Sequence, residues 1–290
     1  VYKRQSLLAE EDYEGARIQL EYWAAHAETP HPHGLFLMGY ACIRLERFEE
    51  AITVLERAVN SDYPTRDPWV ELLAFAYTQA DRPEDAIGLL KGLIESHPER
   101  ARWWKQLGGI LMLMDQIPEG TAGLAVAGAI EPMSFADQKR LARLFAHLGM
   151  PADGAGLLDR ALAGREGEPE FEELMLLGEL WMQARETERA IGVLRKAQEI
   201  SDQGEAAMMI GQLYAQREEY ESARKALEVS LAAYGEDAPA RVYYLLAVIQ
   251  INLGNVPEAA RALERLEADE DYRERARNLS AYLDGMMGRS

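Results

Sequence analysis

Small residues recur along this chain at a nearly constant spacing, and this periodicity constrains the fold more than any other feature. Each of them is followed four positions later by Leu, and successive members are 33 to 36 residues apart. The set is Ala16, Ala51, Ala86, Gly120, Gly154, Ala190, Ala223 and Ala259. A period of this length over almost the entire chain predicts a supersecondary unit that repeats.

A second set of positions, which holds only Gly or Ala, lies twelve residues before the first set. Its members are Gly39, Ala74, Gly108, Ala142, Gly178, Gly211 and Ala247. We interpret the two sets as the contact points of paired antiparallel helices whose backbones approach closely. A bulkier side chain there would overpack the contact, at a cost of about 1–3 kcal/mol. Large residues three positions further on are expected to fill the space between helices, as in Tyr77, Phe145, Trp181 and Tyr214.

Helix-breaking segments such as Tyr63-Pro64, His97-Pro98 and Asp237-Ala238-Pro239 separate the units. The predicted fold is therefore all-α, a single solenoid over residues 1–290 with about eight helix-turn-helix repeats. Glycines in the fourth and fifth units predict the softest helices, since each costs about 1 kcal/mol of helix propensity. The expected boundaries are a truncated first repeat at 1–30, repeats at 31–66, 67–100, 101–134, 135–168, 169–203, 204–238 and 239–269, and a polar capping helix at 270–286.

Composition narrows the classes of partner. The formal net charge of −18 opposes binding to nucleic acid or to anionic lipid, and no cluster of Lys and Arg offsets it. No window approaches the roughly 18 apolar residues that a membrane-spanning helix needs. The chain starts at Val1 without a visible signal peptide, and its first residues resemble the tail of a helix, so we expect an N-terminal segment to be missing. Cys42, the one cysteine, is expected to be a buried small apolar residue.

The sequence contains no recognisable catalytic constellation. Its five histidines are scattered over different units, and paired-cysteine zinc spacing, a GxxxxGK phosphate loop and a GxSxG elbow are all missing. We therefore predict a protein that is not an enzyme and needs no metal or cofactor. Of the pair Trp103-Trp104, Trp104 takes the expected core position, which leaves Trp103 available for another role.

The pattern resembles the tetratricopeptide repeat, a helix-turn-helix unit of about 34 residues. Units such as HGLFLMGYACIRLERFEEAITVLERAVNSDYP carry the resemblance. It implies a right-handed superhelix whose concave groove is lined by the first helix of each unit. Projecting the second, fifth, ninth and twelfth positions of those helices predicts groove residues that bind a protein or peptide partner, and their Met and aromatic content suits adaptable recognition. They are Phe36, Tyr40, Glu71, Phe75, Arg102, Lys105, Met112, Glu172, Met175, Glu179, Met182, Met208, Gln212, Arg241 and Tyr244.

From Pro68 to about Leu266 the chain is similar to one subgroup of these repeats. The resemblance is to proteobacterial proteins encoded beside TonB, ExbB and ExbD. It is carried, in this order, by the segments PWVELLAFAYTQADRPEDAIGLL, WWKQLGGILMLMDQ and ELWMQARETERAIGVLRKAQEISDQGE. The resemblance implies a periplasmic adaptor that assists TonB-dependent transport across the outer membrane, with components of the TonB system as partners. The alternatives are a structural assembly factor for envelope or exopolysaccharide machinery, a regulatory repeat region of a larger protein, and a cytoplasmic location.

Overall fold

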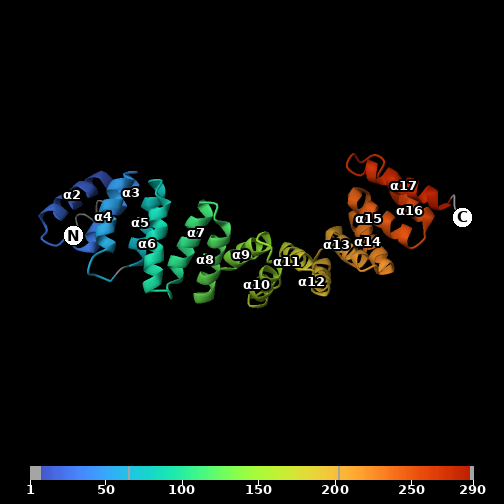
Figure 1. Cartoon of the computed structure of the whole chain (residues 1–290), viewed down its shortest axis with the longest axis horizontal. Helices are drawn as coiled ribbons and strands as arrows, with labels where there is room; N and C mark the ends of the chain where they lie inside the picture. The colour runs from blue at the N-terminus through green and yellow to red at the C-terminus, as the bar shows by residue number, and fades with distance from the viewer. Residues whose placement is uncertain (1–7, 65, 202, 288–290) are drawn as a thin grey trace. The chain divides into compact units, whose positions relative to one another are not determined.

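The computed structural model describes residues 8–64, 66–201 and 203–287, and these residues form helices without any strand (Figure 1). The predicted all-α class is confirmed. The helices are α2 (Tyr13–His26), α3 (Pro32–Arg44), α4 (Phe48–Val59), α5 (Asp67–Gln79), α6 (Pro83–Ser96), α7 (Ala101–Leu113), α8 (Ile117–Ile130), α9 (Phe135–His147), α10 (Pro151–Ala163), α11 (Phe171–Gln183), α12 (Thr187–Ile200), α13 (Gly204–Gln216), α14 (Tyr220–Tyr234), the short 3-10 helix η1 (Gly235–Asp237), α15 (Ala240–Asn252), α16 (Val256–Glu264) and α17 (Arg273–Met287).

The chain divides into two compact units. Unit 1 covers Val1–Ser134 and includes α2 to α8, and unit 2 covers Phe135–Ser290 and includes α9 to α17. The sequence predicts one uninterrupted solenoid, whereas the structure defines the packing of each unit by itself. Continuity of the array from residue 134 to residue 135 stays a prediction.

Within each unit, consecutive helices pair as the two sets of small residues predict. Ala51, Ala74 and Ala86 are completely buried. A Cβ atom added at Gly39 in α3 would lie 2.4 Å from Cγ of Leu55 in α4, and one added at Gly154 would lie 2.4 Å from a backbone carbonyl oxygen of α9. The close approach of the paired helices is therefore confirmed, and glycine in the fourth and fifth repeats serves this contact.

The turn inside each helix pair contains one residue in the left-handed backbone region, with φ between 57° and 77°. These residues are Glu11, Glu46, Asp81, Asp115, Gly149, Arg185, Glu218 and Gly254. In the turn after α3, the N–H of Arg47 donates to the carbonyl of Cys42, and the N–H of Glu46 donates to the carbonyl of Ile43, both at 2.9 Å. This hydrogen-bond pattern is the Schellman motif, which reverses the chain at the end of a helix.

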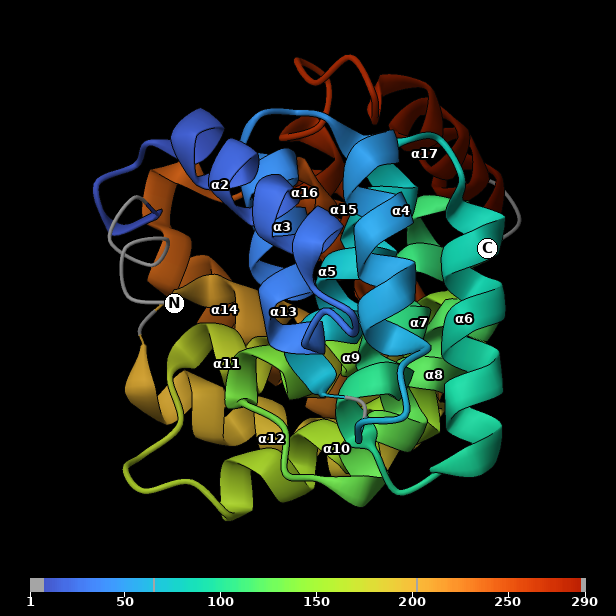
Figure 2. The same cartoon turned by 90° about the vertical axis from the view of Figure 1, so that its left-hand side faces the viewer.

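In unit 1 the first helices of successive pairs lie closer together than the second helices do. In unit 1, α3 contacts α5 and α5 contacts α7, whereas no comparable contact joins α4, α6 and α8 over their described residues. Figure 2 shows α3 and α5 side by side, with α4 and α6 to their right. The first helices therefore share one side of unit 1, which supports the expectation that they form a common surface there.

The core is a row of apolar contacts between these helices. Large side chains at its centre include Leu55, Leu73 and Leu90 in unit 1, each with at most 1% of its surface exposed. Cys42 is also completely buried, as predicted, and burial raises the pKa of its thiol to about 11. A thiol with that pKa is protonated at neutral pH, so this cysteine acts as a small core residue.

The connection between α10 and α11 is held by a partly buried ion pair. Two nitrogens of Arg165 donate to the two carboxylate oxygens of Glu173 at 2.7 Å each, and the N–H of Glu170 donates to Glu173 at 3.0 Å. The guanidinium of Arg165 also lies 4.4 Å from the ring centre of Phe135. These contacts fix residues 164–170 against α9 and α11. The hydrogen bond from Arg165, and then that from the Glu170 N–H, lower the pKa of Glu173, and burial opposes them.

Adjacent glycines in α7 test the close approach. A Cβ added at Gly108 would lie 2.7 Å from the carbonyl oxygen of Gly120, whereas one added at Gly109 meets nothing within 4 Å. Gly108→Ala is expected to lower the free energy of unfolding by about 1–3 kcal/mol through overpacking. Gly109→Ala is expected to raise it by about 0.5–1 kcal/mol, because Ala is the better helix former. Urea unfolding measures both values, and a Gly108→Ala protein as stable as Gly109→Ala would contradict the close contact.

The Arg165–Glu173 pair predicts a pH effect. Because the pKa of Glu173 is lower in the folded state, its stabilisation is present above the ordinary pKa of 4.5 and is lost as the pH falls through the lowered value. Glu173→Gln is expected to reduce the free energy of unfolding at pH 7 by about 1–2 kcal/mol. The loss should shrink as the pH falls toward 3. Glu172→Gln, at the exposed neighbour, serves as the matched control and should change stability by less than about 0.5 kcal/mol at either pH. Equal pH profiles for the two variants would contradict the assignment.

Candidate partner-binding faces

The predicted groove residues fall into two groups, which belong to different units. The unit 1 face lies on α3, α5 and α7. Arg102 and Lys105 are exposed there, Phe75 is also exposed, and Phe36 and Tyr40 are half-buried. Its predicted members are Phe36, Tyr40, Glu71, Phe75, Arg102, Lys105 and Met112. The unit 2 face lies on α11, α13 and α15. Its exposed or half-buried predicted members are Glu172, Glu179, Met182, Gln212, Arg241 and Tyr244, and the exposed Glu205 of α13 is added to them.

Two aromatic residues of the unit 1 face are anchored in the protein. Phe36 stacks on His33 at 5.9 Å between ring centres and packs against the core. Tyr40 meets Tyr13 of α2 edge to face at 6.3 Å. These rings are half-buried and held by neighbours. They form the rigid part of the face.

Phe75 is different, because 46% of its surface is exposed on α5. One turn earlier, Glu71 forms an ion pair of 2.9 Å with Arg102 of α7. Gly109 takes the same repeat position on α7 as Phe75 does on α5, and the space above its Cα is open. An exposed ring beside an open position and a charged pair offers a partner an apolar contact with a polar edge.

The unit 2 face is predominantly acidic. Glu172, Glu179 and Glu205 are exposed, and Met182 and Tyr244 are half-buried. At its other end, Arg241 donates to the amide oxygen of Gln212 at 2.6 Å. The ring of Tyr244 lies 5.4 Å from that of Tyr272, which precedes α17.

The charges on this face are coupled to one another. The pKa of Glu179 is raised, first because the surrounding protein partly removes its carboxylate from water and then because Glu205 is negatively charged. Arg143 of α9 has the opposite effect. The face therefore places carboxylates of α11 and α13 within electrostatic reach of each other, which favours a cationic partner group.

Two methionines predicted to face the groove are buried. Met175 and Met208 are each only 7% exposed and belong to apolar clusters of the core. The expectation that they lie on a surface the fold does not need to fill is wrong. The physical reason is that the fifth position of these two helices points toward the neighbouring helix of the stack, so a long apolar side chain fills that contact.

The roles expected for the two adjacent tryptophans are reversed. Trp103 is only 1% exposed and belongs to the core. Trp104 is half-buried, and its indole N–H donates to the carbonyl of Pro98 at 2.9 Å. Trp103 is thus a scaffold residue.

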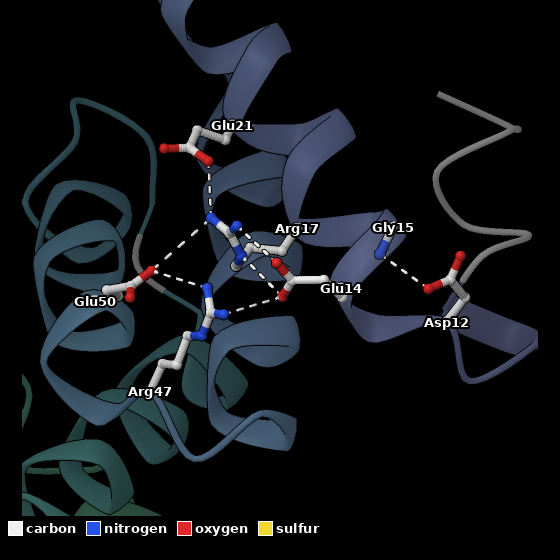
Figure 3. Close-up of polar contacts among 7 residues, drawn as sticks. All are labelled: Asp12, Glu14, Gly15, Arg17, Glu21, Arg47 and Glu50. Carbon is white, nitrogen blue, oxygen red and sulfur yellow. Dashed lines mark hydrogen bonds and ion pairs between the residues drawn. The ribbon is translucent and has the colours of Figure 1, made fainter.

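A polar network that the sequence reasoning missed joins the second helices of unit 1 (Figure 3). Arg17 of α2 contacts Glu14 at 2.9 Å and Glu21 at 2.8 Å, and Arg47 contacts Glu14 at 3.4 Å. Glu50 lies 3.9 Å from both arginines. The available signal is an acidic residue at the second position of one second helix and an Arg in the next turn. It recurs in Glu49 and Arg82, which are 3.2 Å apart.

The described residues contain neither a metal site nor a membrane-spanning helix. No group of three His, Cys, Asp or Glu side chains in that part of the chain is arranged to hold a metal ion. Among the same residues, none of the helices has the length and apolar character required to cross a membrane.

Stacked antiparallel helix pairs with a shared first-helix surface define the class of helical repeat proteins. Models of the tetratricopeptide repeat match residues 32–63, 139–205 and 208–273, which together make up more than half of the chain. The chain belongs to the tetratricopeptide repeat family. Proteins of this family generally act as scaffolds for protein–protein interaction.

Solved structures support the same fold. The Naa15/Naa10 complex bound to HypK-THB aligns with a TM-score of 0.70 and 18% identity over 87% of this chain, which spans only 39% of that chain. The MamA protein aligns with a TM-score of 0.50 and 16% identity over 61% of this chain and 96% of its own. Identities this low carry information on the fold alone. Comparison with curated protein sequences gives no significant match.

The coupling across the unit 2 face can be measured directly. Glu205→Gln removes a negative charge and is expected to lower the pKa of Glu179, whereas Arg143→Gln removes a positive charge and is expected to raise it. Carboxyl carbon NMR titration of Glu179 reads both changes. Replacement of Glu95 of α6, which belongs to unit 1, by Gln is the control and should leave the titration unchanged. A Glu179 titration that none of these changes moves would contradict the coupling.

Proposed function

We propose that this chain is a non-enzymatic adaptor that binds protein or peptide segments on the first-helix faces of its two units. The observation that carries the proposal is Phe75, an aromatic ring 46% exposed on the side shared by the first helices of unit 1. Aromatic side chains that become buried at an interface dominate its binding energy. Scaffolding is the general activity of the family to which the chain belongs.

The unit 1 face suits an apolar partner side chain flanked by a polar one. The open position at Gly109 leaves room beside the shared surface, and Phe75 supplies an apolar wall. Glu71 and Arg102 already satisfy each other at 2.9 Å, so they form a polar edge that needs no partner charge. This arrangement is an apolar centre with a polar rim, as in protein interfaces generally.

The unit 2 face suits a partner segment with basic side chains. Glu172, Glu179 and Glu205 present negative charge, and the half-buried Met182 adds an adaptable apolar contact. Such charges mainly set the association rate and the choice of partner. The two faces therefore differ in the chemistry they favour.

We further propose that the adaptor works in the periplasm and assists TonB-dependent transport across the outer membrane. The support is the similarity of the segments between Pro68 and Leu266, including WMQARE and SDQGE, to tetratricopeptide proteins encoded beside TonB, ExbB and ExbD. A component of that system would be the partner captured on the faces.

Photo-crosslinking in the native host tests both proposals, namely binding on the first-helix faces and the role in TonB-dependent transport. Probes replace Phe75 in unit 1 and Glu179 in unit 2, and a probe at Tyr22 of α2 is the matched exposed control at 65% exposure. The expected result is that a probe at position 75 or at position 179 captures a partner protein that the probe at position 22 does not capture. Capture of TonB, ExbB, ExbD or an outer-membrane transporter supports the finer proposal. Capture of envelope assembly proteins instead would overturn it and favour an assembly factor.

With the captured partner purified, single substitutions measure the energetic role of the unit 1 face. Phe75→Ala is expected to weaken binding by about 30-fold, the loss typical of a buried aromatic residue at an interface centre. Tyr22→Ala should change the affinity by less than about twofold. Equal affinities of both variants and the unchanged protein would contradict binding at this face.

A further inference from the structure

Unit 2 contains an apolar groove on the side of its second helices, away from the unit 2 face. The groove encloses about 530 Å³ between α10 and α12, with α11 as its floor. Leu162, Leu174 and Leu177 lie at the bottom and are at most 8% exposed. Ile200 forms part of the wall and is 50% exposed at the end of α12. A large apolar side chain this exposed beside a concave apolar floor is available for contact with another molecule.

Charged side chains surround this apolar floor. Asp159, Glu168 and Glu199 contribute carboxylates and Lys196 contributes one ammonium group, and all four are exposed. Over the described parts of the chain, none of these three carboxylates forms an ion pair. The rim therefore carries an excess of negative charge that no neighbour neutralises, which favours a cationic group on whatever occupies the groove.

The groove is bounded by a segment that is already fixed. Glu168 and Pro169 belong to the connection between α10 and α11, where Arg165 holds Glu173 through two hydrogen bonds of 2.7 Å. Glu170 and Glu173 also form a capping box at the start of α11. Since this wall is held by the protein's own contacts, an incoming segment does not need to order it, which lowers the entropic cost of binding.

We infer that this groove is a docking site for a partner segment that presents an apolar side chain next to Lys or Arg. The apolar side chain packs on Leu174, Leu177 and Ile200, and the basic group faces the carboxylates of the rim. A small polar ligand fits less well, because small-molecule sites orient their ligands through polar groups within the pocket. Here the polar groups among the described lining residues lie at the rim. The site is separate from the first-helix faces, so it does not depend on the function proposed for them.

Methyl NMR of the full chain, labelled at Ile, Leu and Val, provides the test. The probes are three synthetic peptides of equal length and helical periodicity, composed of Leu with Lys, Leu with Glu, and Ser with Lys. The Leu/Lys peptide is expected to shift the methyl signals of Ile200, Val193 and Leu162 in a saturable manner. The other two peptides should bind there at least tenfold more weakly. Shifts confined to the first-helix faces, or spread evenly over the acidic surface, would overturn the proposal.

Matched substitutions separate docking from general charge attraction. Ile200→Ser is expected to weaken binding of the Leu/Lys peptide about tenfold, and Ile18→Ser, at an equally exposed Ile of α2, should leave it unchanged. Glu199→Lys is expected to weaken it several-fold more than Glu95→Lys, which makes the same charge change on α6. If the two variants of each pair lose the same affinity for the Leu/Lys peptide, binding is non-specific and the proposed docking site is overturned. Thermal unfolding of every variant verifies that the fold is retained.

Discussion

The close approach of the two helices in each repeat is the constraint on which the rest of the structure depends. At the contact between α9 and α10, a single methyl group on Gly154 would lie 2.4 Å from a backbone oxygen. Such distances restrict the crossing positions to Gly or Ala, and the crossing fixes how the remaining side chains of both helices are directed. Residues that point along the stack must be apolar, whereas residues that point out of it are free to vary. The exposed faces of the first helices are therefore built from the positions that the crossing does not constrain.

This constraint also explains why the fold could be predicted from the sequence. The small residues are required by backbone contact, so they recur even where the surrounding sequence has diverged, and Leu four positions later always returns to the core. The burial of Cys42 was also predicted correctly, because this small residue lies in an apolar helical pattern. The prolines of the predicted breaks Tyr63-Pro64 and His97-Pro98 lie between helices, because proline cannot continue a helix.

Which positions of the first helices are exposed was predicted less well, and Met175 and Met208 show why. Projection by repeat position assumes that every first helix has the same tilt and the same neighbours. In unit 2 the fifth position of α11 and of α13 is covered, and both methionines are only 7% exposed. For Trp103 and Trp104, two adjacent large rings could each fill the core position, and only packing decided between them. The turns were missed because most of their left-handed residues are acidic or Arg rather than Gly. Their backbone is held by the Schellman hydrogen bonds, so the usual glycine signal is weak.

The groove beside α10 follows from an irregularity in the repeat, and it shows how such a protein acquires a second kind of surface. Gly154 of the fifth unit and Ala190 of the sixth belong to the first set of small residues and are 36 positions apart. The connection before α11 therefore has room for the segment that Arg165 and Glu173 hold in place. The helix crossings on either side keep their small residues, so the irregularity leaves the core unchanged. The irregularity changes the side of the second helices, where the connection between α10 and α11 adds a wall to the groove between α10 and α12. Because that wall is fixed by an ion pair and not by the crossing, its rim charges can vary without cost to the fold. The regular repeat thus supplies the apolar core, and the irregular connection shapes the groove beside it.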